Sequence, residues 1–195
     1  MREPSMTLLI LGLVLFLGTH SISIISWRWR DSMVAKMGEM PFKGVYGLLA
    51  IVGLVLIVIG YGQARMDPTW LYQPPAFLRH VNMLLMLFVF PALLAAYFPG
   101  RIQQALGHPM LVAVKAWALA HLLVNGTLAD VLLFGGFLVW AVADRISLKR
   151  RPKRDIPQLP ASRANDIIVV VGGLALYVAF AFWLHPILFG VPVIS

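Results

Sequence analysis

The chain has 195 residues, of which 60% are hydrophobic and 12% are charged. Soluble domains carry about twice this charged fraction, so the composition excludes an ordinary soluble protein and indicates a multi-pass membrane protein. The lack of cysteine excludes disulfides, cysteine-ligated iron–sulfur clusters, thiolate catalysis and covalent C-x-x-C-H haem attachment.

Six apolar stretches predict transmembrane helices, because about 20 apolar residues cross the hydrocarbon core of a bilayer. The predicted spans cover residues 6–25, 44–63, 80–98, 110–124, 127–143 and 167–188. A signal peptide is the alternative for the first stretch, but its length and the lack of a small-x-small cleavage site favour a permanent span. The predicted fold is therefore all-α: a polytopic membrane helix bundle that forms a single domain over residues 1–195.

Several residues outside and within the spans predict local features. Trp27-Arg-Trp-Arg30 forms an aromatic and basic interface anchor after the first span, and the linker from there to Lys43 is polar. Pro91 predicts a kink in the third span, and Asn125-Gly126 predicts a turn between the fourth and the fifth.

The basic residues are concentrated in alternate connections. The connections between spans one and two, three and four, and five and six hold four, one and seven Lys or Arg, which is twelve of the 16. Arg2, Arg65 and Arg79 lie on the opposite side, and Lys115 lies within the fourth span. The positive-inside rule then places the twelve in the cytoplasm and both termini on the non-cytoplasmic side. The net charge of +8 reflects this topology and contact with anionic lipid, not nucleic-acid binding.

Four polar side chains interrupt the apolar stretch 115–130: Lys115, His121, Asn125 and Asp130. Ionisable side chains at membrane depth are costly, so they raise a functional hypothesis. His121 and Asn125 are four residues apart and share one helical face. For Asp130 the alternatives are a helix cap on the fifth span, a pairing near Asn125, and a proton relay, of which a structural role is the more usual.

Two histidines are predicted at the same depth. His20 lies about 8 Å above the cytoplasmic end of the first span, at the helical rise per residue. If Lys115 snorkels to the cytoplasmic interface, His121 lies about 9 Å deep by the same rise. Two imidazoles at one depth on two helices fit axial ligands on either side of a flat cofactor. The alternative is that each histidine is an interhelical hydrogen-bonding group.

Other features limit the chemistry further. With no cysteine and few buried carboxylates, neutral imidazoles favour haem iron or copper over a hard cation. No Ser-His-Asp, Walker or zinc-hydrolase motif is present, and no catalytic residue is assigned. His108 at the cytoplasmic turn and His80 at the start of the third span are secondary candidates for the site, together with Asp130 and Lys115. His108 and His185 each precede a proline at a span end, where an interface role is the simpler interpretation.

The sequence resembles the NnrU family over nearly its whole length. The motifs that carry the resemblance are Phe16-Leu-Gly-Thr-His20-Ser21, Lys43-Gly-Val-Tyr46, Gly60-Tyr-Gly62, Pro74-Pro75-Ala, Arg79-His80, His108-Pro109, Lys115-Ala-Trp-Ala-Leu-Ala-His121, Asn125-Gly126-Thr-Leu-Ala-Asp130 and Asp144-Arg145. The resemblance implies a multi-pass protein of the bacterial inner (cytoplasmic) membrane and a link to nitrogen-oxide metabolism, the reduction of nitrite and nitric oxide in denitrification. It implies no settled biochemical activity.

A more distant resemblance is to plant 15-cis-zeta-carotene isomerase, which contains an NnrU-like domain. That enzyme isomerises a carbon–carbon double bond in a lipophilic polyene and depends on haem b held by histidines. The matching positions here are His20, in the His-Ser motif, and His121, thirteen residues after the His-Pro motif. The resemblance therefore implies haem b bound through the pair that the depth argument selects.

Two hypotheses follow for function. In the first, His20 and His121 ligate the iron of haem b, Asn125 orients a ligand imidazole, and the protein is a candidate haem-dependent double-bond isomerase with a lipophilic polyene as substrate. In the second, the protein is a non-enzymatic accessory or assembly factor for nitrite or nitric oxide reductase, with the membrane reductase as its partner. A transporter is less favoured, because neither paired broken helices nor an internal repeat is visible.

Overall fold

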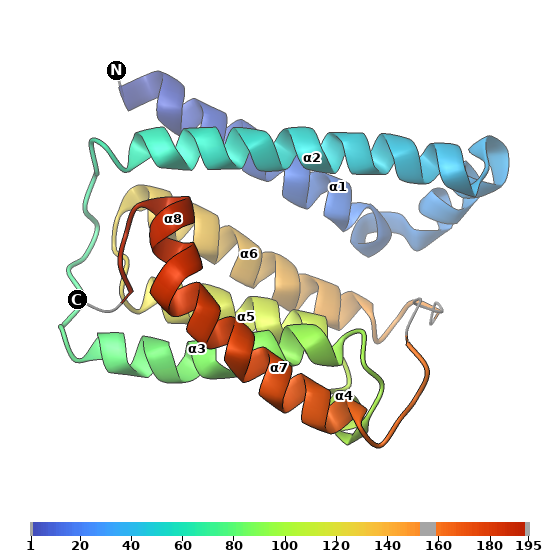
Figure 1. Cartoon of the computed structure of the whole chain (residues 1–195). Helices are drawn as coiled ribbons and strands as arrows, with labels where there is room; N and C mark the ends of the chain where they lie inside the picture. The colour runs from blue at the N-terminus through green and yellow to red at the C-terminus, as the bar shows by residue number, and fades with distance from the viewer. Residues whose placement is uncertain (1, 153–158, 194–195) are drawn as a thin grey trace. The chain divides into compact units, whose positions relative to one another are not determined.

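The computed structural model describes residues 2–152 and 159–193, with side chains from residue 5 onward, and these residues are almost entirely helical (Figure 1). The elements are α1 (Arg2–Met37), α2 (Glu39–Ala64), α3 (Leu78–Ala95), α4 (Arg101–Leu106), α5 (Pro109–Leu122), α6 (Leu128–Ser147), α7 (Asn165–Ala179), the π-helical turn η1 (Phe180–Leu184) and α8 (His185–Phe189). The described part contains no strand, only an isolated bridge between Trp70 and Thr127. The all-α prediction is confirmed.

Four helical segments of the described chain are long and apolar enough to cross a membrane. They are Ser5–Met37, Glu39–Ala64, Leu78–Ala95 and Asn165–Phe189. The fourth and fifth predicted spans are helices too, but they differ from the other four. With 14 residues, α5 extends about 21 Å, which is shorter than the roughly 30 Å hydrocarbon core. The 20 residues of α6 include Asp130, Asp144 and Arg145. A membrane protein is thus supported, whereas a count of six spans remains a prediction.

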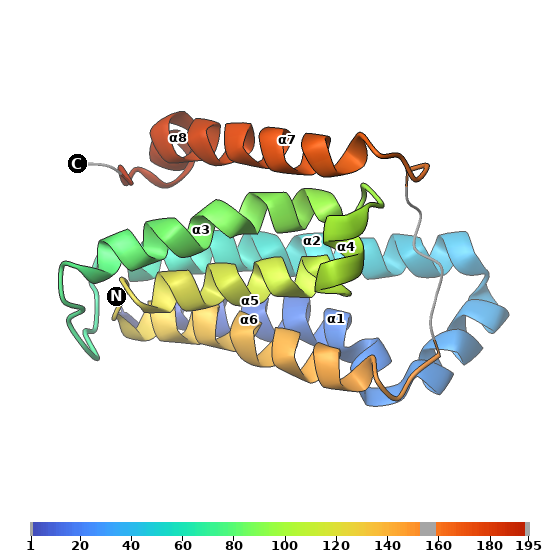
Figure 2. The same ribbon diagram turned by 90° about the horizontal axis from the view of Figure 1, so that it is seen from below.

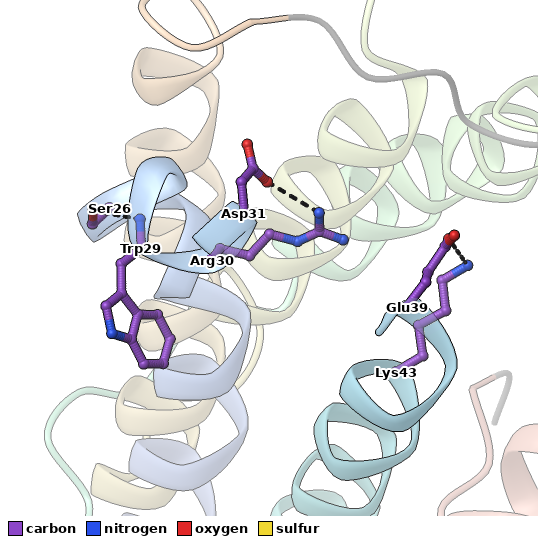
Figure 3. A network of polar contacts seen from close by, with 6 residues as sticks. All are labelled: Ser26, Trp29, Arg30, Asp31, Glu39 and Lys43. Atoms are coloured by element: carbon purple, nitrogen blue, oxygen red, sulfur yellow. Dashed lines mark hydrogen bonds and ion pairs between the residues drawn. The ribbon is translucent and has the colours of Figure 1, made fainter. Parts of the chain in front are cut away.

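The connection between the first two predicted spans is helical, where the sequence suggested a polar linker. Ser26 has φ −154° and ψ 96°, which breaks α1 into two segments. Its hydroxyl accepts a hydrogen bond from the backbone N–H of Trp29 at 3.2 Å, so Ser26 caps the second segment (Figure 3). Gly38, at φ +86°, then allows the reversal into α2. Figure 3 also shows the Glu39–Lys43 ion pair at 2.6 Å, one helical turn apart at the start of α2.

The contacts divide the chain into two compact units. The first unit, within the described residues, comprises 2–75 and 121–152, and the second comprises 76–120 and 159–193. In the first unit α1 and α2 run antiparallel and pack through glycine. A Cβ on Gly12 would lie 2.6 Å from Ile57 N, and one on Gly53 would lie 2.7 Å from Phe16 N. Small residues of this kind let helix backbones approach closely in lipid.

The second unit is built on α3 and α7, which pack against each other; α7 crosses α3 obliquely in Figure 1 and lies alongside it in Figure 2. Pro91 lies inside α3, which continues to Ala95. Gly173 of α7 packs on this proline, because a Cβ at Gly173 would lie 2.6 Å from Pro91 N. Val89 and Ala92 of α3 form a buried apolar cluster with Ala113 of α5.

Candidate functional site

His20 in α1 is held by a backbone carbonyl one turn earlier. Its Nδ1 lies 2.7 Å from Phe16 O. A carbonyl oxygen can only accept a hydrogen bond, so Nδ1 carries the proton, and in the neutral imidazole Nε2 keeps its lone pair. Metal-ligating histidines commonly donate their other ring N–H to a carbonyl in this way, which fixes the tautomer and the ring orientation. His20 is therefore prepared as a ligand through Nε2.

Aromatic rings from three helices surround the His20 imidazole. Phe16 of α1 stacks on it with ring centroids 4.2 Å apart. Tyr46 of α2 and Trp140 of α6 present edges to it, at 5.3 Å and 6.0 Å respectively. Phe16 also contacts Phe137 of α6 at 5.6 Å. The imidazole thus lies in an aromatic environment in which α1, α2 and α6 meet.

Trp140 has an unsatisfied donor in this environment. Within the described chain its Nε1 is buried and has no hydrogen-bond partner. A buried donor without a partner costs about 1–3 kcal/mol, so native structures rarely contain one without a reason. The Nε2 lone pair of His20 can bind a metal, and the neighbouring Trp140 N–H can donate to an acceptor atom. A haem has both an iron and hydrogen-bond acceptors. The residues around His20 therefore fit a haem.

His121 lies in the last turn of α5, and its ring stacks on Phe134 of α6 at 4.6 Å with an interplanar angle of 25°. Asn125, four residues later, donates from Nδ2 to His121 O at 3.0 Å. The contact that the structure shows from Asn125 is thus to the backbone of His121, which caps the end of α5, and not to the imidazole.

The two histidines contact α6 at different levels. His121 stacks on Phe134, whereas His20 meets Trp140, six residues further along α6. At 1.5 Å per residue these two positions are about 9 Å apart along the helix axis. Two imidazoles on one metal need their ligating nitrogens only about 4 Å apart, since a metal–imidazole bond is about 2 Å long.

The equal depth of His20 and His121 in a membrane stays a prediction. The predicted start of the fourth span, residue 110, agrees with the start of α5. In the structure α5 begins at Pro109, so Lys115 lies in its middle and His121 at its far end.

Asp130 is a structural cap, one of the roles that the sequence allowed. Its Oδ2 accepts from Thr127 N at 2.9 Å and from Thr127 Oγ1 at 2.6 Å, and Thr127 Oγ1 accepts in return from Asp130 N at 3.2 Å. This capping box begins α6. The second oxygen, Oδ1, accepts from the hydroxyl of Tyr61 in α2 at 2.7 Å. Only 5% of Asp130 is exposed, so its carboxylate ties α2 to α6 from a buried position.

The loop after α2 is joined to the turn between α5 and α6. Leu71 N donates to Gly126 O at 2.8 Å, and the Tyr72 hydroxyl donates to Asn125 O at 2.8 Å and to Leu122 O. Partial burial, and then the negative charge of Asp130, raise the pKa of the Tyr72 phenol. A side chain at Gly126 would collide with the backbone carbonyl of Tyr72. These contacts fix the end of α5 that carries His121.

The remaining candidates lie elsewhere. His80 is exposed near the start of α3, and His108 precedes α5. His80, His108 and Lys115 all belong to the second unit, whereas His20, His121, Asn125 and Asp130 belong to the first. Across the described residues there is no group of three or more His, Cys, Asp or Glu side chains placed to hold a metal ion.

Tyr46, Tyr61 and Trp140 were not predicted as part of a site. The Thr127-x-x-Asp130 spacing is a capping-box pattern that the sequence does carry. Tyr46 and Tyr61 belong to motifs that carry the family resemblance, but the contacts of all three aromatic residues depend on how the helices pack.

Comparison with protein families gives one match, and it covers both units. The family model described as NnrU protein matches residues 8–193. Comparison with curated proteins and with solved structures gives no match. A family model that matches nearly the whole chain establishes membership, and the chain belongs to the NnrU family.

Proposed function

We propose that this NnrU family membrane protein binds haem b, with Nε2 of His20 as the primary iron ligand. The observation that carries the proposal is the His20 environment: Nδ1 is anchored on Phe16 O at 2.7 Å, and the buried Nε1 of Trp140 lacks a partner next to the imidazole. Bound haem would supply the iron chemistry needed to isomerise a lipophilic polyene or to react with nitrogen oxides.

The chain's own residues have defined tasks in this proposal. The Phe16 carbonyl fixes the tautomer of His20 and keeps Nε2 unprotonated. The rings of Phe16, Tyr46 and Trp140 cover part of the imidazole, which is half-buried. The Trp140 N–H is available to an acceptor on the bound group.

His121 remains the proposed second ligand, on the basis of the family resemblance. The two histidines contact residues of α6 that lie about 9 Å apart along its axis, and a shared iron would require their ligating nitrogens to lie about 4 Å apart. The proposal therefore assigns unequal roles: His20 is required for binding, and His121 sets the coordination state.

The test is the haem content of the full chain purified in detergent from haem-replete membranes. We expect the wild type to carry haem b, His20→Ala to lose it, and His121→Ala to keep part of it with a shifted Soret band. His185→Ala is a matched control, since His185 Nδ1 also lies 2.8 Å from a backbone carbonyl, that of Val191. Full haem content in a folded His20→Ala would overturn the assignment. A featureless wild-type spectrum would overturn haem binding and favour the accessory role.

The finer topology is also proposed here. We infer an inner-membrane protein with both termini outside the cytoplasm, in which the connections that hold most of the basic residues face the cytoplasm. Contacts within each unit support this pairing of connections. The loop after α2 meets the α5–α6 turn in the first unit, and the residues after α3 meet the start of α7 in the second.

A further inference from the structure

An open cavity of about 530 Å³ lies at one end of the second unit. Its walls come from two connections, the one after α3 and the one before α7. The polar residues that line it, with one glycine, are Gly100, Arg101, Gln104, Ser162, Arg163 and Asp166. It lies outside the unit that holds His20 and His121, so it is independent of the proposed haem site.

Hydrogen bonds hold the two walls together, and three of them join residues more than sixty positions apart in the sequence. The Asp166 carboxylate accepts from the backbone N–H groups of Arg101 and Ile102, at 3.1 Å and 3.0 Å. Asn165 Nδ2 donates to Pro99 O at 2.8 Å and to Pro160 O at 3.1 Å. A side chain at Gly100 would collide with the Asp166 carboxylate. The cavity is thus a built feature of the unit.

The charges that face the cavity are mainly positive. Asp166, the one acidic residue that lines it, is engaged with the backbone of α4. Within the described chain, neither the Arg101 nor the Arg163 guanidinium forms an ion pair with a carboxylate. Two guanidinium groups, with a Gln amide and a Ser hydroxyl, are suited to a phosphate group and to neighbouring hydroxyls.

The cavity lies where two apolar helices end. Gly100 and Arg101 follow α3, and Arg163 comes just before α7, and both helices qualify as membrane spans. Tyr97, which is 49% exposed, is placed as an interfacial aromatic residue would be. Directly after Asp166, Ile167 and Val171 are 67% and 61% exposed and share one face of α7. An apolar face that starts beside a basic cavity matches the layout of a lipid, with acyl chains below a charged headgroup.

We propose that this cavity binds the headgroup of an anionic phospholipid, with Arg101 and Arg163 on the phosphate and Gln104 and Ser162 on the headgroup hydroxyls. Basic pockets at the ends of transmembrane helices recognise anionic headgroups by the same electrostatic attraction. A free phosphate carries the same charge, but it has no acyl chain that could pack against the exposed apolar face of Ile167 and Val171.

The test is native mass spectrometry of the delipidated full chain in detergent, titrated with phosphatidylglycerol or with phosphatidylcholine. We expect phosphatidylglycerol to bind in preference. Arg101→Gln/Arg163→Gln should weaken it roughly twenty-five-fold, since each basic residue near anionic headgroups contributes about a factor of five. Lys36→Gln/Lys149→Gln is the control, because it removes the same charge from exposed positions outside the cavity. Circular dichroism confirms that each variant is folded.

Three outcomes would overturn the proposal. The first is equal binding of the two lipids by the wild type, and the second is undiminished phosphatidylglycerol binding by the folded arginine variant. The third is displacement of phosphatidylglycerol by millimolar inorganic phosphate with the same dependence on Arg101 and Arg163, which would assign the cavity to a soluble phosphate. Failure to displace the lipid supports the headgroup.

Discussion

Asp130 illustrates how a buried charge is stabilised at the residue scale in this protein. An ionised carboxylate in an apolar setting is costly unless hydrogen bonds satisfy its oxygens. Here the N–H and hydroxyl of Thr127 satisfy one oxygen, and the hydroxyl of Tyr61 satisfies the other. These contacts explain why a carboxylate lies at this position, so a proton-relay role is not needed to account for Asp130.

We expect Asp130→Asn and Tyr61→Phe each to lower the free energy of unfolding by about 1–3 kcal/mol, because each leaves a buried polar group without its partner. In Asp130→Asn the amide nitrogen must face either Thr127 or Tyr61, both of which are donors. Apparent melting temperatures in detergent test this, with Thr127→Ser as the control that keeps the hydroxyl. A folded Asp130→Asn that melts like the wild type but loses function would contradict the structural role.

Tyr72 gives a prediction about pH. Because its pKa is raised in the folded protein, its phenol contributes stability that is fully present below the usual tyrosine pKa of about 10 and is lost as pH rises through the raised value. We therefore expect the difference in melting temperature between the wild type and Tyr72→Phe to be constant from pH 7 to about 9.5 and to shrink above pH 10. A melting-temperature difference that grows as the pH rises above about 10 would contradict this prediction, because it would mean that folding lowers the pKa of Tyr72.

At the scale of elements, α2 provides a test of glycine packing within one helix. Gly53 and Gly60 touch the backbone of α1, whereas Gly47 and Gly62 have no atom within 4 Å of the Cβ position. We expect Gly53→Ala and Gly60→Ala to destabilise the first unit by about 1–3 kcal/mol through overpacking. Gly47→Ala and Gly62→Ala should be neutral or stabilising by up to about 1 kcal/mol, since alanine favours helix.

Equal melting temperatures for all four variants would show that α1 and α2 do not pack as described. The comparison is internal, because the four substitutions add the same methyl group to the same helix.

The sequence predicts the elements better than it predicts their ends. Each of the six apolar stretches is helical in the structure, because hydrophobic length is a strong local signal. The helical connection after Ser26 was missed, since capping by one hydroxyl is a weak local signal. The start of α5 was predicted to within one residue, at 110 against Pro109, whereas the relative depth of His20 and His121 depends on how the helices pack and stays a prediction. The cap at Asp130 was foreseen, but its bond to Tyr61 depends on long-range packing.

At the scale of the whole molecule, the absence of cysteine allows a clean test of topology. Met66, 85% exposed between α2 and α3, is predicted outside, and Lys149, exposed after α6, is predicted in the cytoplasm. A membrane-impermeant maleimide should label Met66→Cys in cells with a permeable outer membrane and an intact inner membrane. Lys149→Cys should be labelled only after lysis of the inner membrane. The reverse pattern would place both termini in the cytoplasm.

The central claim is that His20 ligates haem iron, and rescue of a cavity variant tests it most directly. His20→Gly removes the imidazole and should leave the purified protein without a b-type Soret band. Reconstitution with haem and free imidazole should then restore the band, because the imidazole can occupy the space left among Phe16, Tyr46 and Trp140. A band that persists in His20→Gly without imidazole would contradict the account, and so would a folded variant that imidazole fails to rescue.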